Sequence, residues 1–442
     1  MGVRRKVLAL VAGVGVALGS AVAFAATGEA AVACSSTVWA EGVTYTAGQQ
    51  VTYQSKLWQA LVTHTAYAGT GWNPAATPTL WKDLGACSGG GTPSPSVSAT
   101  TSRPPSPSPS VTTSPTASPS PTATGGTCAV KGRPAGKVLQ GYWENWDGAS
   151  NGVHPGMGWI PINDSRITQH GYNVLMAAFP VIRSDGTVLW ENGMDAGVKV
   201  PTAAEICAAK AQGATILMSI GGAAAGIDLS SSAVADKFVA TIVPILKAYN
   251  FDGIDIDIET GLSGSGSIGT LSASQSNLIR IIDGVLAQMP SNFGLTMAPE
   301  TAYVTGGSVT YGSIWGSYLP IIKKYLDNGR LWWLNMQYYN GSMYGCSGDS
   351  YSAGTVQGFT VQTQCLNNGL TIQGTTIKIP YDKQVPGLPA QPGAGGGYMT
   401  PALVSQAYNS VPGIKGLMTW SINWDGSKSW TFGDNVKALQ GR

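Results

Sequence analysis

The chain has 442 residues and a mass of 45.6 kDa, which is enough for two or three domains. Its net charge is only +2, so it lacks the excess of basic residues that is typical of nucleic-acid-binding proteins. Only 11% of the residues are charged, against roughly 25% in an average globular protein, whereas Gly (59), Pro (26) and Trp (14) are frequent. This composition favours a secreted protein that binds neutral polar ligands such as carbohydrate, because sugar faces stack on indole rings.

The first 33 residues have the layout of a cleaved signal peptide. A basic start, residues 1–6, precedes the apolar stretch Val7–Leu18, and small residues with two Ala-x-Ala sites follow. A retained anchor fits less well, because Gly interrupts the apolar run, which is shorter than the ~20 residues of a membrane span. We expect residues 1–33 to be removed and the mature protein to be extracellular, without a membrane partner. The pair Arg4 and Arg5 leaves a twin-arginine export route open.

Cysteine usage agrees with export. The six cysteines form no Cys-x-x-Cys pair and the three histidines are scattered, so we expect neither a metal site nor a cofactor. An even number of cysteines in an exported chain predicts disulfides. Cys34 with Cys87 would enclose a small module, which makes a lipid anchor on Cys34 the weaker alternative. Cys346 with Cys365 would close a loop, and the remaining two, Cys128 and Cys207, are either a pair or free thiols.

A linker divides the mature chain in two. Residues 88–127 contain repeated Pro-Ser and Pro-Thr, no aromatic residue and one charged residue, Arg103, so they cannot form a core. Such a tract favours an extended polyproline conformation that acts as a spacer. We therefore predict a small module at 34–87, a linker at 88–127 and a large domain at 128–442.

The small module is rich in aromatic residues. Its four tryptophans and three tyrosines are too many for a domain of this size to bury, so some should form an exposed sugar-binding strip. Gly48–Tyr53 and Lys56–Leu61 are typical of short strands, which predicts an all-β, disulfide-closed fold. The order Trp-x5-Tyr-x2-Gly, the strand LWQA and the closing LWKDLG resemble carbohydrate-binding modules of families 5 and 12. The resemblance implies chitin binding, for which we select Trp58 and Trp72, with Trp81 in the core.

The large domain repeats a strand-and-helix pattern. Eight apolar runs of strand length, separated by helix-sized connections, predict a (β/α)8 TIM barrel, an α/β fold, with a doubly wound sheet as the alternative. The runs are Lys137–Trp143, Asn173–Phe179, Ala214–Gly222, Phe251–Glu259, Phe293–Pro299, Trp332–Asn340, Gln384–Ala390 and Ile414–Ile422. Functional residues of such a barrel lie at the carboxyl ends of the strands.

The fourth run carries three acids in alternation. Asp255, Asp257 and Glu259 alternate with isoleucines, so on a strand the acids face one way, ~6–7 Å apart, and the isoleucines face the helices. Burial and mutual repulsion favour protonation of at least one acid, as a general acid near neutral pH requires. A solvated polar face fits the apolar flanks poorly, and a calcium or magnesium site lacks further oxygen ligands nearby.

These residues carry a resemblance to a known family. Residues 252–259 (DGIDIDIE) match the DxxDxDxE motif of glycoside hydrolase family 18, and 219–222 (SIGG) match its SxGG element. Residues 337–340 (QYYN) and Trp420 fall where the family has a strand-six tyrosine and a strand-eight tryptophan. The chain therefore resembles a secreted bacterial chitinase of this family.

The resemblance implies a retaining, substrate-assisted mechanism. Glu259 would protonate the glycosidic oxygen, and the acetamido carbonyl of the sugar would attack the anomeric carbon to form an oxazolinium ion. Asp257 would orient the acetamido N–H, with Asp255 sharing a proton beneath it, and Tyr339 would donate to the acetamido oxygen. Further substrate contacts are assigned to Gln337, Asn340, Trp420, Met297 and Ser219.

The segment between the last two strands refines the expected activity. Some family members insert a domain there, whereas residues 390–414 are too few for one, which predicts an open groove and endo cleavage. We expect a monomer that acts on chitin and N-acetylglucosamine oligosaccharides. The alternatives are an endo-β-N-acetylglucosaminidase, a peptidoglycan hydrolase, or a chitin-binding lectin. The intact Glu259 disfavours the lectin.

Overall fold

A computed structural model describes residues 37–40, 43–46, 48–61, 64–66, 73–75, 81–87, 126–148, 154, 157–223 and 226–442. The chain divides into two compact units, Met1–Pro107 and Ser108–Arg442, and each is described by itself. The expected signal peptide and all but the last two linker residues lie outside the described part. Among the described residues, no helix has the length and apolar character needed to cross a membrane.

The first unit is a small all-β module, as predicted. Strands β2 (Gln50–Tyr53), β3 (Lys56–Ala60) and β5 (Trp81–Ala86) form an antiparallel sheet, and β1 (Thr44–Tyr45) pairs with β4 (His64–Thr65). Its core holds Tyr45, Val51, Trp58, Ala60, Ala66 and Trp81. Cys87 is disulfide-bonded, and its expected partner lies outside the described residues.

The second unit contains an eight-stranded parallel sheet that closes into a barrel. The sheet order is β13-β12-β11-β10-β7-β6-β19-β18. Parallel bridges Leu334↔Gln384 and Gln337↔Gly387 join its two edge segments, which confirms the barrel and excludes the doubly wound sheet. The strands are β6 (Val138–Glu144), β7 (Val174–Ala178), β10 (Thr215–Gly221), β11 (Gly253–Asp257), β12 (Gly294–Met297), β13 (Trp333–Leu334), β18 (Gly387–Pro389) and β19 (Gly416–Trp420).

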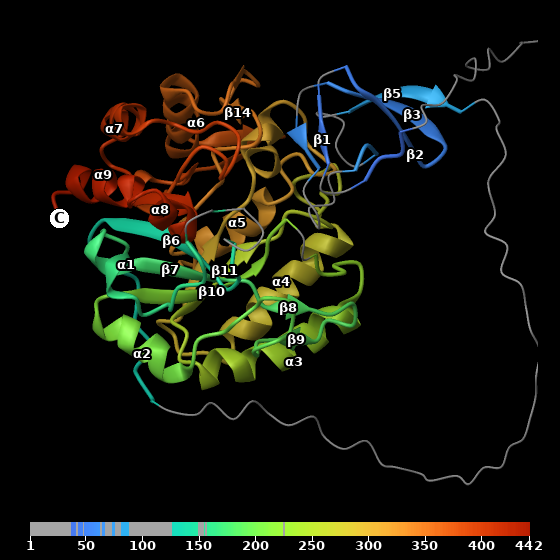
Figure 1. The fold of residues 1–442 in the computed structure, drawn as a ribbon. Coiled ribbons are helices and arrows are strands. Elements are labelled where there is room, and N and C mark those ends of the chain that lie inside the picture. The colour runs from blue at the N-terminus through green and yellow to red at the C-terminus, as the bar shows by residue number, and fades with distance from the viewer. Residues whose placement is uncertain are drawn as a thin grey trace, which may run out of the picture. The chain divides into compact units, whose positions relative to one another are not determined.

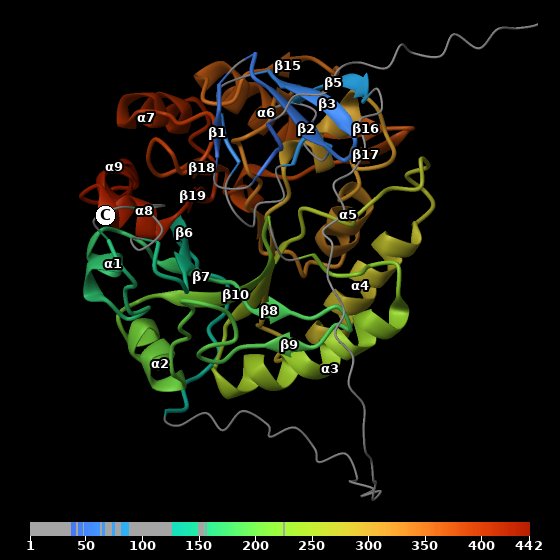
Figure 2. The same ribbon diagram turned by 45° about the vertical axis from the view of Figure 1, so that its right-hand side comes forward.

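Helices surround these strands, as Figures 1 and 2 show. Several begin at side-chain caps, and α2 and α4 have complete capping boxes, Thr202 with Glu205 and Ser272 with Gln275. The helices are α1 (Ser165–Gln169), α2 (Ala203–Ala211), α3 (Ser232–Ala248), α4 (Ala273–Leu286), α5 (Leu319–Asp327), α6 (Val356–Asn368), α7 (Pro401–Ser410), α8 (Ile422–Ser427) and α9 (Thr431–Leu439). Only α7 lies between β18 and β19, so no domain is inserted there.

Shorter elements occupy the connections. The hairpins are β8 (Val181–Ile182) with β9 (Val188–Leu189), β14 (Met343–Tyr344) with β15 (Ser350–Tyr351), and β16 (Leu370–Ile372) with β17 (Thr375–Ile377). Single-turn 3-10 helices are η1 (Thr301–Tyr303), η2 (Thr305–Ser308) and η3 (Tyr381–Lys383).

Alternation along the strands creates two hydrophobic layers. On β11, Ile254 and Ile256 are fully buried in the layer shared with helix residues such as Phe238 and Leu278. Inside the barrel, a second cluster includes Tyr142, Met176, Ala298, Tyr339 and Met418. Because the isoleucines pack outward, the acids between them face the barrel interior, as the sequence predicted.

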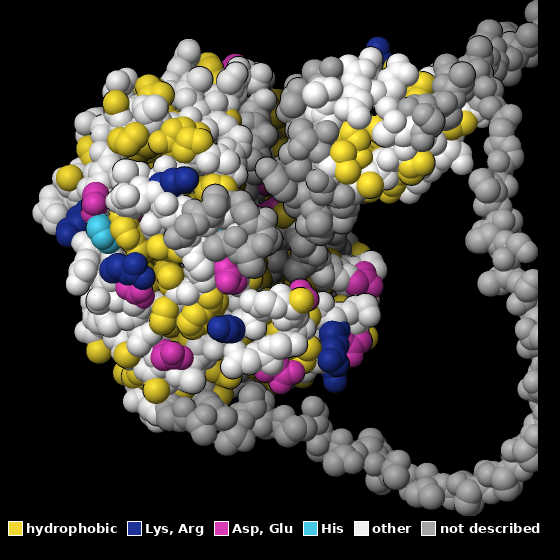
Figure 3. All heavy atoms as spheres, viewed as in Figure 1, with side chains coloured by type: hydrophobic (Ala, Val, Ile, Leu, Met, Phe, Trp, Pro, Cys, Tyr) yellow, Lys and Arg dark blue, Asp and Glu magenta, His cyan; other side chains and the backbone are white. Residues whose placement is uncertain are grey.

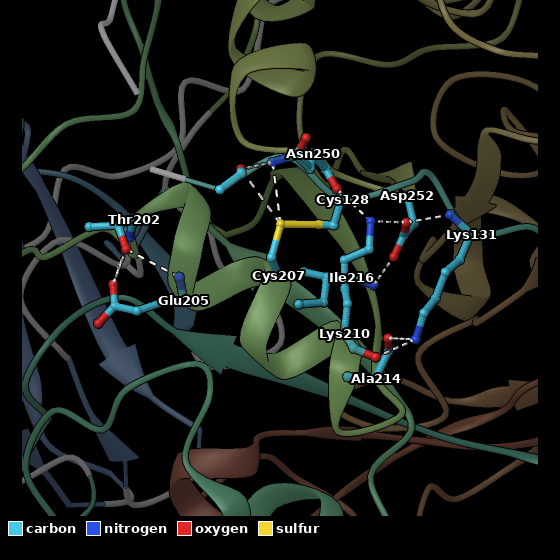
Figure 4. Close-up of a disulfide and its surroundings, with 11 residues drawn as sticks. Cys128, Lys131, Thr202, Glu205, Cys207, Lys210, Ala214, Ile216, Asn250 and Asp252 are labelled. Carbon is cyan, nitrogen blue, oxygen red and sulfur yellow. Dashed lines mark hydrogen bonds and ion pairs between the residues drawn. A yellow bond between two sulfur atoms is a disulfide. The ribbon is translucent and has the colours of Figure 1, made fainter. Parts of the chain in front are cut away.

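The amino-terminal ends of the strands are fixed by a disulfide and a buried ion pair (Figure 4). Cys128 is bonded to Cys207, which shows that these two cysteines are a pair. The buried Asp252 carboxylate lies 2.6 Å from Lys210 Nζ and accepts the backbone N–H of Lys131 at 2.7 Å. Asp252, the first acid of the motif, therefore lies at the opposite end of β11 from Glu259 and stabilises the fold. The expected Cys346–Cys365 disulfide is also present.

Charged side chains are sparse on the visible surface. On the face seen in Figure 3, Lys, Arg, Asp and Glu side chains lie singly or in small groups of mixed sign. This distribution matches the low content of charged residues in the sequence. Such a surface provides no strong electrostatic attraction for a highly charged polymer.

Candidate active site

Asp255 is the centre of a hydrogen-bond network inside the barrel. The fully buried carboxylate accepts Tyr142 OH at 2.7 Å, Ser219 Oγ at 2.8 Å and Thr296 Oγ1 at 2.7 Å. It also accepts Asn335 Nδ2 at 3.1 Å. Burial raises the pKa of Asp255, and the four donors oppose that rise because they stabilise the ionised form. The donors come from β6, β10, β12 and the segment after β13, so four parts of the barrel hold one carboxylate.

Gln337 connects the other two acids of the strand. Its side-chain amide Nε2 lies 3.0 Å from Asp257 Oδ1 and 2.9 Å from Glu259 Oε1. The same nitrogen donates to the backbone carbonyl of Ala298 at 3.2 Å. Asp257 is 3% exposed and Gln337 is 4% exposed, whereas Glu259 is half-buried. The outermost acid is therefore the one that solvent and a ligand can reach.

Both acids hold their protons more strongly than free carboxyl groups. Burial and the neighbouring carboxylates of Glu259 and Asp255 raise the pKa of Asp257 well above its ordinary value. Burial, followed by the charge of Glu300, raises the pKa of Glu259 to about 7. A carboxylic acid that stays protonated near neutral pH is suited to general acid catalysis.

Two tyrosines hold the end of β11. Tyr318 OH donates to the Ile258 carbonyl at 2.8 Å and accepts the Ile258 N–H at 2.9 Å. Tyr303 OH donates to the backbone carbonyl of Glu259. The backbone that carries Glu259 is thus fixed although it lies beyond the last residue of the strand, Asp257.

An aromatic wall lies beside the acids. Trp420 packs 5.5 Å from Tyr142 and 6.0 Å from Phe179 between ring centroids, and Trp146 is stacked against Phe179 at 6.5 Å. The same wall lines a pocket of about 490 Å³ to which Asn145 also contributes. Half-buried rings around an open pocket provide apolar surface on which a sugar face can stack.

A buried hydrogen bond between a glutamate and a histidine supports the tryptophan. Glu144 Oε2 lies 2.7 Å from His154 Nε2, with both side chains fully buried. Ser421, which follows Trp420, donates its hydroxyl to the other oxygen of Glu144. His154 Nδ1 lies 2.9 Å from the Met157 carbonyl, so the position of Trp420 depends on a network that crosses from β6 to β19.

Comparison with known proteins identifies the family of the barrel. The Glycosyl hydrolases family 18 pattern matches residues 138–340, and Endochitinase 37 of Trichoderma harzianum is 83% identical over 70% of this chain and 92% of its own length. The chain belongs to glycosyl hydrolase family 18. Chitinase Chi52 of Paenibacillus xylanexedens is 30% identical over 88% of each chain. Because these relatives include a fungal and a bacterial protein, the bacterial source stays a prediction.

Two further comparisons concern the small module and the fold. Residues 38–82 match the Carbohydrate-binding module family 5/12 pattern, which agrees with the resemblance of the small module. A crystal structure of a family 18 chitinase from Chromobacterium violaceum superimposes with a TM-score of 0.60 at 30% identity. It covers 93% of this chain and 100% of that one.

Most residues predicted from the family motif lie together at the carboxyl ends of the strands. Asp257 and Glu259 both accept the side-chain amide of Gln337, and Asp255 lies two residues before Asp257 on the same strand with its own four donors. Tyr339, 6% exposed, belongs to the cluster inside the barrel that Trp420 also contacts. Burial and the charge of Asp257 raise the pKa of the Tyr339 hydroxyl well above its ordinary value, so it remains a proton donor.

Two predicted substrate contacts are wrong. Ser219 is fully buried and its hydroxyl donates to Asp255, so it supports that acid from within the barrel. Met297 is also fully buried, and it packs in the outer layer between strands and helices. The alternation on β12 explains this position, because Thr296 and Ala298 face inward and the residue between them must face outward.

Asn340 lies at the rim of the site and has a different contact from the one expected. Its side-chain carbonyl accepts the Gly396 N–H at 2.8 Å, and its backbone N–H donates to the Gly396 carbonyl at 3.0 Å. Asn340 thus fixes the glycine-rich segment after β18. Its contact with substrate stays a prediction, which its exposed side chain permits.

The small module corrects one prediction and leaves another open. Trp58 is only 8% exposed and packs in the module core, and its Nε1 donates to the Tyr53 carbonyl at 3.1 Å, so it does not form an exposed binding strip. It lies on the same side of β3 as Ala60, and both belong to the module core with Val51 and Trp81. Trp72 lies outside the described residues. Trp81, 1% exposed, is in the core as expected.

Several residues of the site were not singled out from the sequence. Thr296 and Asn335 contact Asp255, and Trp146 and Phe179 extend the aromatic wall. Each lies within or just after a predicted strand, but a threonine or an asparagine has no spacing that marks it as a partner of a buried acid. Glu300 lies three residues after the end of β12, where the sequence alone does not separate a loop residue from a residue of the site.

Proposed function

We propose that this protein is an endochitinase that hydrolyses β-1,4 bonds between N-acetylglucosamine units with retention of configuration. The observation that carries the proposal is the Asp257–Gln337–Glu259 group, in which Glu259, whose pKa burial raises to about 7, lies at the solvent-facing end of β11. Its relatives from Trichoderma harzianum and Paenibacillus xylanexedens carry the names endochitinase and chitinase.

The order of the acids along the strand assigns their roles. Glu259, the most accessible, donates its proton to the glycosidic oxygen as that bond breaks. The acetamido carbonyl of the same sugar forms the new bond to the anomeric carbon, and Asp257 accepts the acetamido N–H and stabilises the positive oxazolinium. Tyr339 donates to the acetamido oxygen, and Trp420 supports the apolar face of the sugar.

Asp255 acts through Asp257. Because its two oxygens already accept four donors, Asp255 is better suited to remain ionised than to share a proton with its neighbour. Its negative charge raises the pKa of Asp257 in the free enzyme and stabilises the cationic intermediate during reaction. Asp257 and Glu259 repel each other when both are ionised, so they keep one proton between them. That proton lies on Glu259 when the glycosidic bond breaks, and the ionised Asp257 then accepts the acetamido N–H. In the second step Glu259 accepts a proton from water, and the oxygen of that water bonds to the anomeric carbon from the side that the leaving group occupied. The bond between the acetamido oxygen and the anomeric carbon breaks in this step, which restores the acetamido group.

The direct test uses the N-acetylglucosamine hexamer with resolved anomers. The full chain should release short oligomers that are initially in the β form, and Glu259→Gln should lose nearly all turnover while it still binds chitin. An exposed carboxylate outside the site supplies the matched control, since Glu191→Gln should retain turnover. Substantial activity of Glu259→Gln, or initial α products, would contradict the assignment.

The alternatives predict different outcomes of the same test. An endo-β-N-acetylglucosaminidase or a peptidoglycan hydrolase would leave the hexamer intact and would cleave a glycoprotein glycan or a murein fragment. A lectin would bind the hexamer and release no product. The family 5/12 match at residues 38–82 favours an insoluble polysaccharide substrate, because a tethered module raises the local concentration of the enzyme at a surface.

The domain plan and the compartment belong to the same proposal. Residues 1–33 direct secretion, 34–87 bind chitin, 88–127 are the linker, and 128–442 form the catalytic barrel of an extracellular monomer. Deletion of residues 34–87 should reduce turnover of crystalline chitin more than turnover of the soluble hexamer. Equal loss on both substrates would refute the targeting role, and a dimer in sedimentation would refute the monomer.

A further inference from the structure

We propose that Glu300 is a positioning residue whose negative charge extends the pH range in which Glu259 keeps its catalytic proton. This inference rests on the proposed function, in which Glu259 is the general acid. Glu300 lies outside the DxxDxDxE motif, which already contains four carboxyl groups.

Strand register places Glu300 beside Glu259. In the parallel pair β11–β12, Asp255 is opposite Thr296, and the next hydrogen bond joins the Ala298 N–H to the Ile256 carbonyl at 2.9 Å. If the same register continues beyond the two strands, Asp257 is opposite Ala298 and Glu259 is opposite Glu300. Neighbouring strands lie ~4.8 Å apart, so two carboxyl groups at the same level are close neighbours.

The facing of the residues agrees with this position. Thr296 and Ala298 point into the barrel, so Glu300, two residues further on, also points toward the site. Its backbone forms a parallel bridge with Gln337, the residue whose amide contacts Asp257 and Glu259. Glu259, Glu300 and Gln337 therefore occupy one level on three adjacent parts of the barrel.

The contacts of Glu300 leave its charge uncompensated. Among the residues that the structure describes, none forms a hydrogen bond or an ion pair with the half-buried Glu300 carboxylate, and no Lys, Arg or His forms an ion pair with Asp257 or Glu259. The groups that face Glu259 are Asp257 on its own strand, Tyr303 after β12, and Gln337 and Tyr339 after β13. Of these, Gln337 stabilises the ionised form of Glu259, whereas the charge of Glu300 opposes it.

The charge of Glu300 acts on the proton affinity of Glu259. Burial raises the pKa of Glu300, and burial and the charge of Glu300 raise the pKa of Glu259. When Glu300 is ionised, its negative charge disfavours ionisation of Glu259. The acid stays protonated to a higher pH than burial alone would allow.

The test is the pH dependence of kcat/KM for the full chain on the N-acetylglucosamine hexamer between pH 4 and 10. The alkaline limb reports ionisation of the general acid in the free enzyme. Glu300→Gln should move this limb to lower pH by about one unit, so that the ratio of rates at pH 8 and pH 5 falls roughly tenfold relative to wild type. Glu300→Asp, which keeps the charge, should restore most of the limb.

The outcomes separate this inference from the proposed function. Loss of turnover in Glu259→Gln with an unmoved alkaline limb in Glu300→Gln would overturn the role of Glu300 and leave the acid assignment intact. A uniform loss at every pH would show a structural role only. Retained turnover in Glu259→Gln would refute the proposed function itself. If Glu300→Gln does not fold, Glu300→Ser removes the same charge, and Glu191→Gln controls for the loss of an exposed carboxylate.

Discussion

Replacing Glu259 with Gln should make the protein more stable at alkaline pH. The ionised form of Glu259 is disfavoured in the folded active site, and Gln cannot ionise. The pKa of Glu259 rises from 4.5 to about 7 on folding. Between these values the folded state binds more protons than the unfolded state, so the free energy of unfolding falls as pH rises. Below pH 4.5 both states are protonated and this cost is absent.

The size of the effect follows from the two pKa values. At 1.36 kcal/mol per pH unit, a rise from 4.5 to about 7 costs about 3 kcal/mol of stability once the pH exceeds both values. Gln has nearly the same shape and no charge, so Glu259→Gln should recover most of this free energy at pH 8. For a domain of this size, that gain corresponds to a rise in Tm on the order of 5 °C or more.

The assay is denaturant unfolding of the full chain, followed by tryptophan fluorescence, at pH 4.5 and pH 8. The difference between Glu259→Gln and wild type should be small at pH 4.5 and large at pH 8, and Glu191→Gln should match wild type at both. An equal gain at both pH values would show improved packing and not relief of a charge. No gain at pH 8 would refute the raised proton affinity of Glu259.

Three further predictions follow from single contacts. Gln337→Met removes the amide that stabilises ionised Glu259, so the alkaline limb of the kcat/KM profile should move to higher pH by about one unit. A shift to lower pH would contradict this reasoning, and Gln288→Met, at an exposed glutamine, is the control. Met297→Leu should retain turnover and lower the free energy of unfolding by less than about 1.5 kcal/mol, because the Met297 side chain packs in the outer layer. A rise in KM without a change in kcat would indicate that Met297 contacts the substrate after all. The Cys128–Cys207 disulfide closes a loop of 79 residues and so restricts the unfolded chain. Its removal should lower the free energy of unfolding by about 4 kcal/mol in chemical denaturation, and an unchanged denaturation midpoint would contradict this reasoning.

Local sequence determined the architecture and the acid strand. Period-two alternation in residues 252–259 is a property of the strand itself, so Asp255, Asp257 and Glu259 could be assigned to one face without any tertiary information. The eight apolar runs predicted the barrel strands for the same reason. The composition of residues 88–127 excluded a core there, because burial requires apolar side chains that this segment lacks.

Only the tertiary structure decided which side chains meet across strands. Register between β11 and β12 brought Thr296 to Asp255, and a parallel bridge brought Glu300 to Gln337; such pairings relate segments about forty residues apart. The direction in which each strand turns its side chains also decided that Met297 packs against the helices and that Trp58 belongs to the core of the small module. The sequence by itself determined which residues could supply acid chemistry. Folding determined their donors and neighbours, and through burial and repulsion it determined which acid keeps its proton.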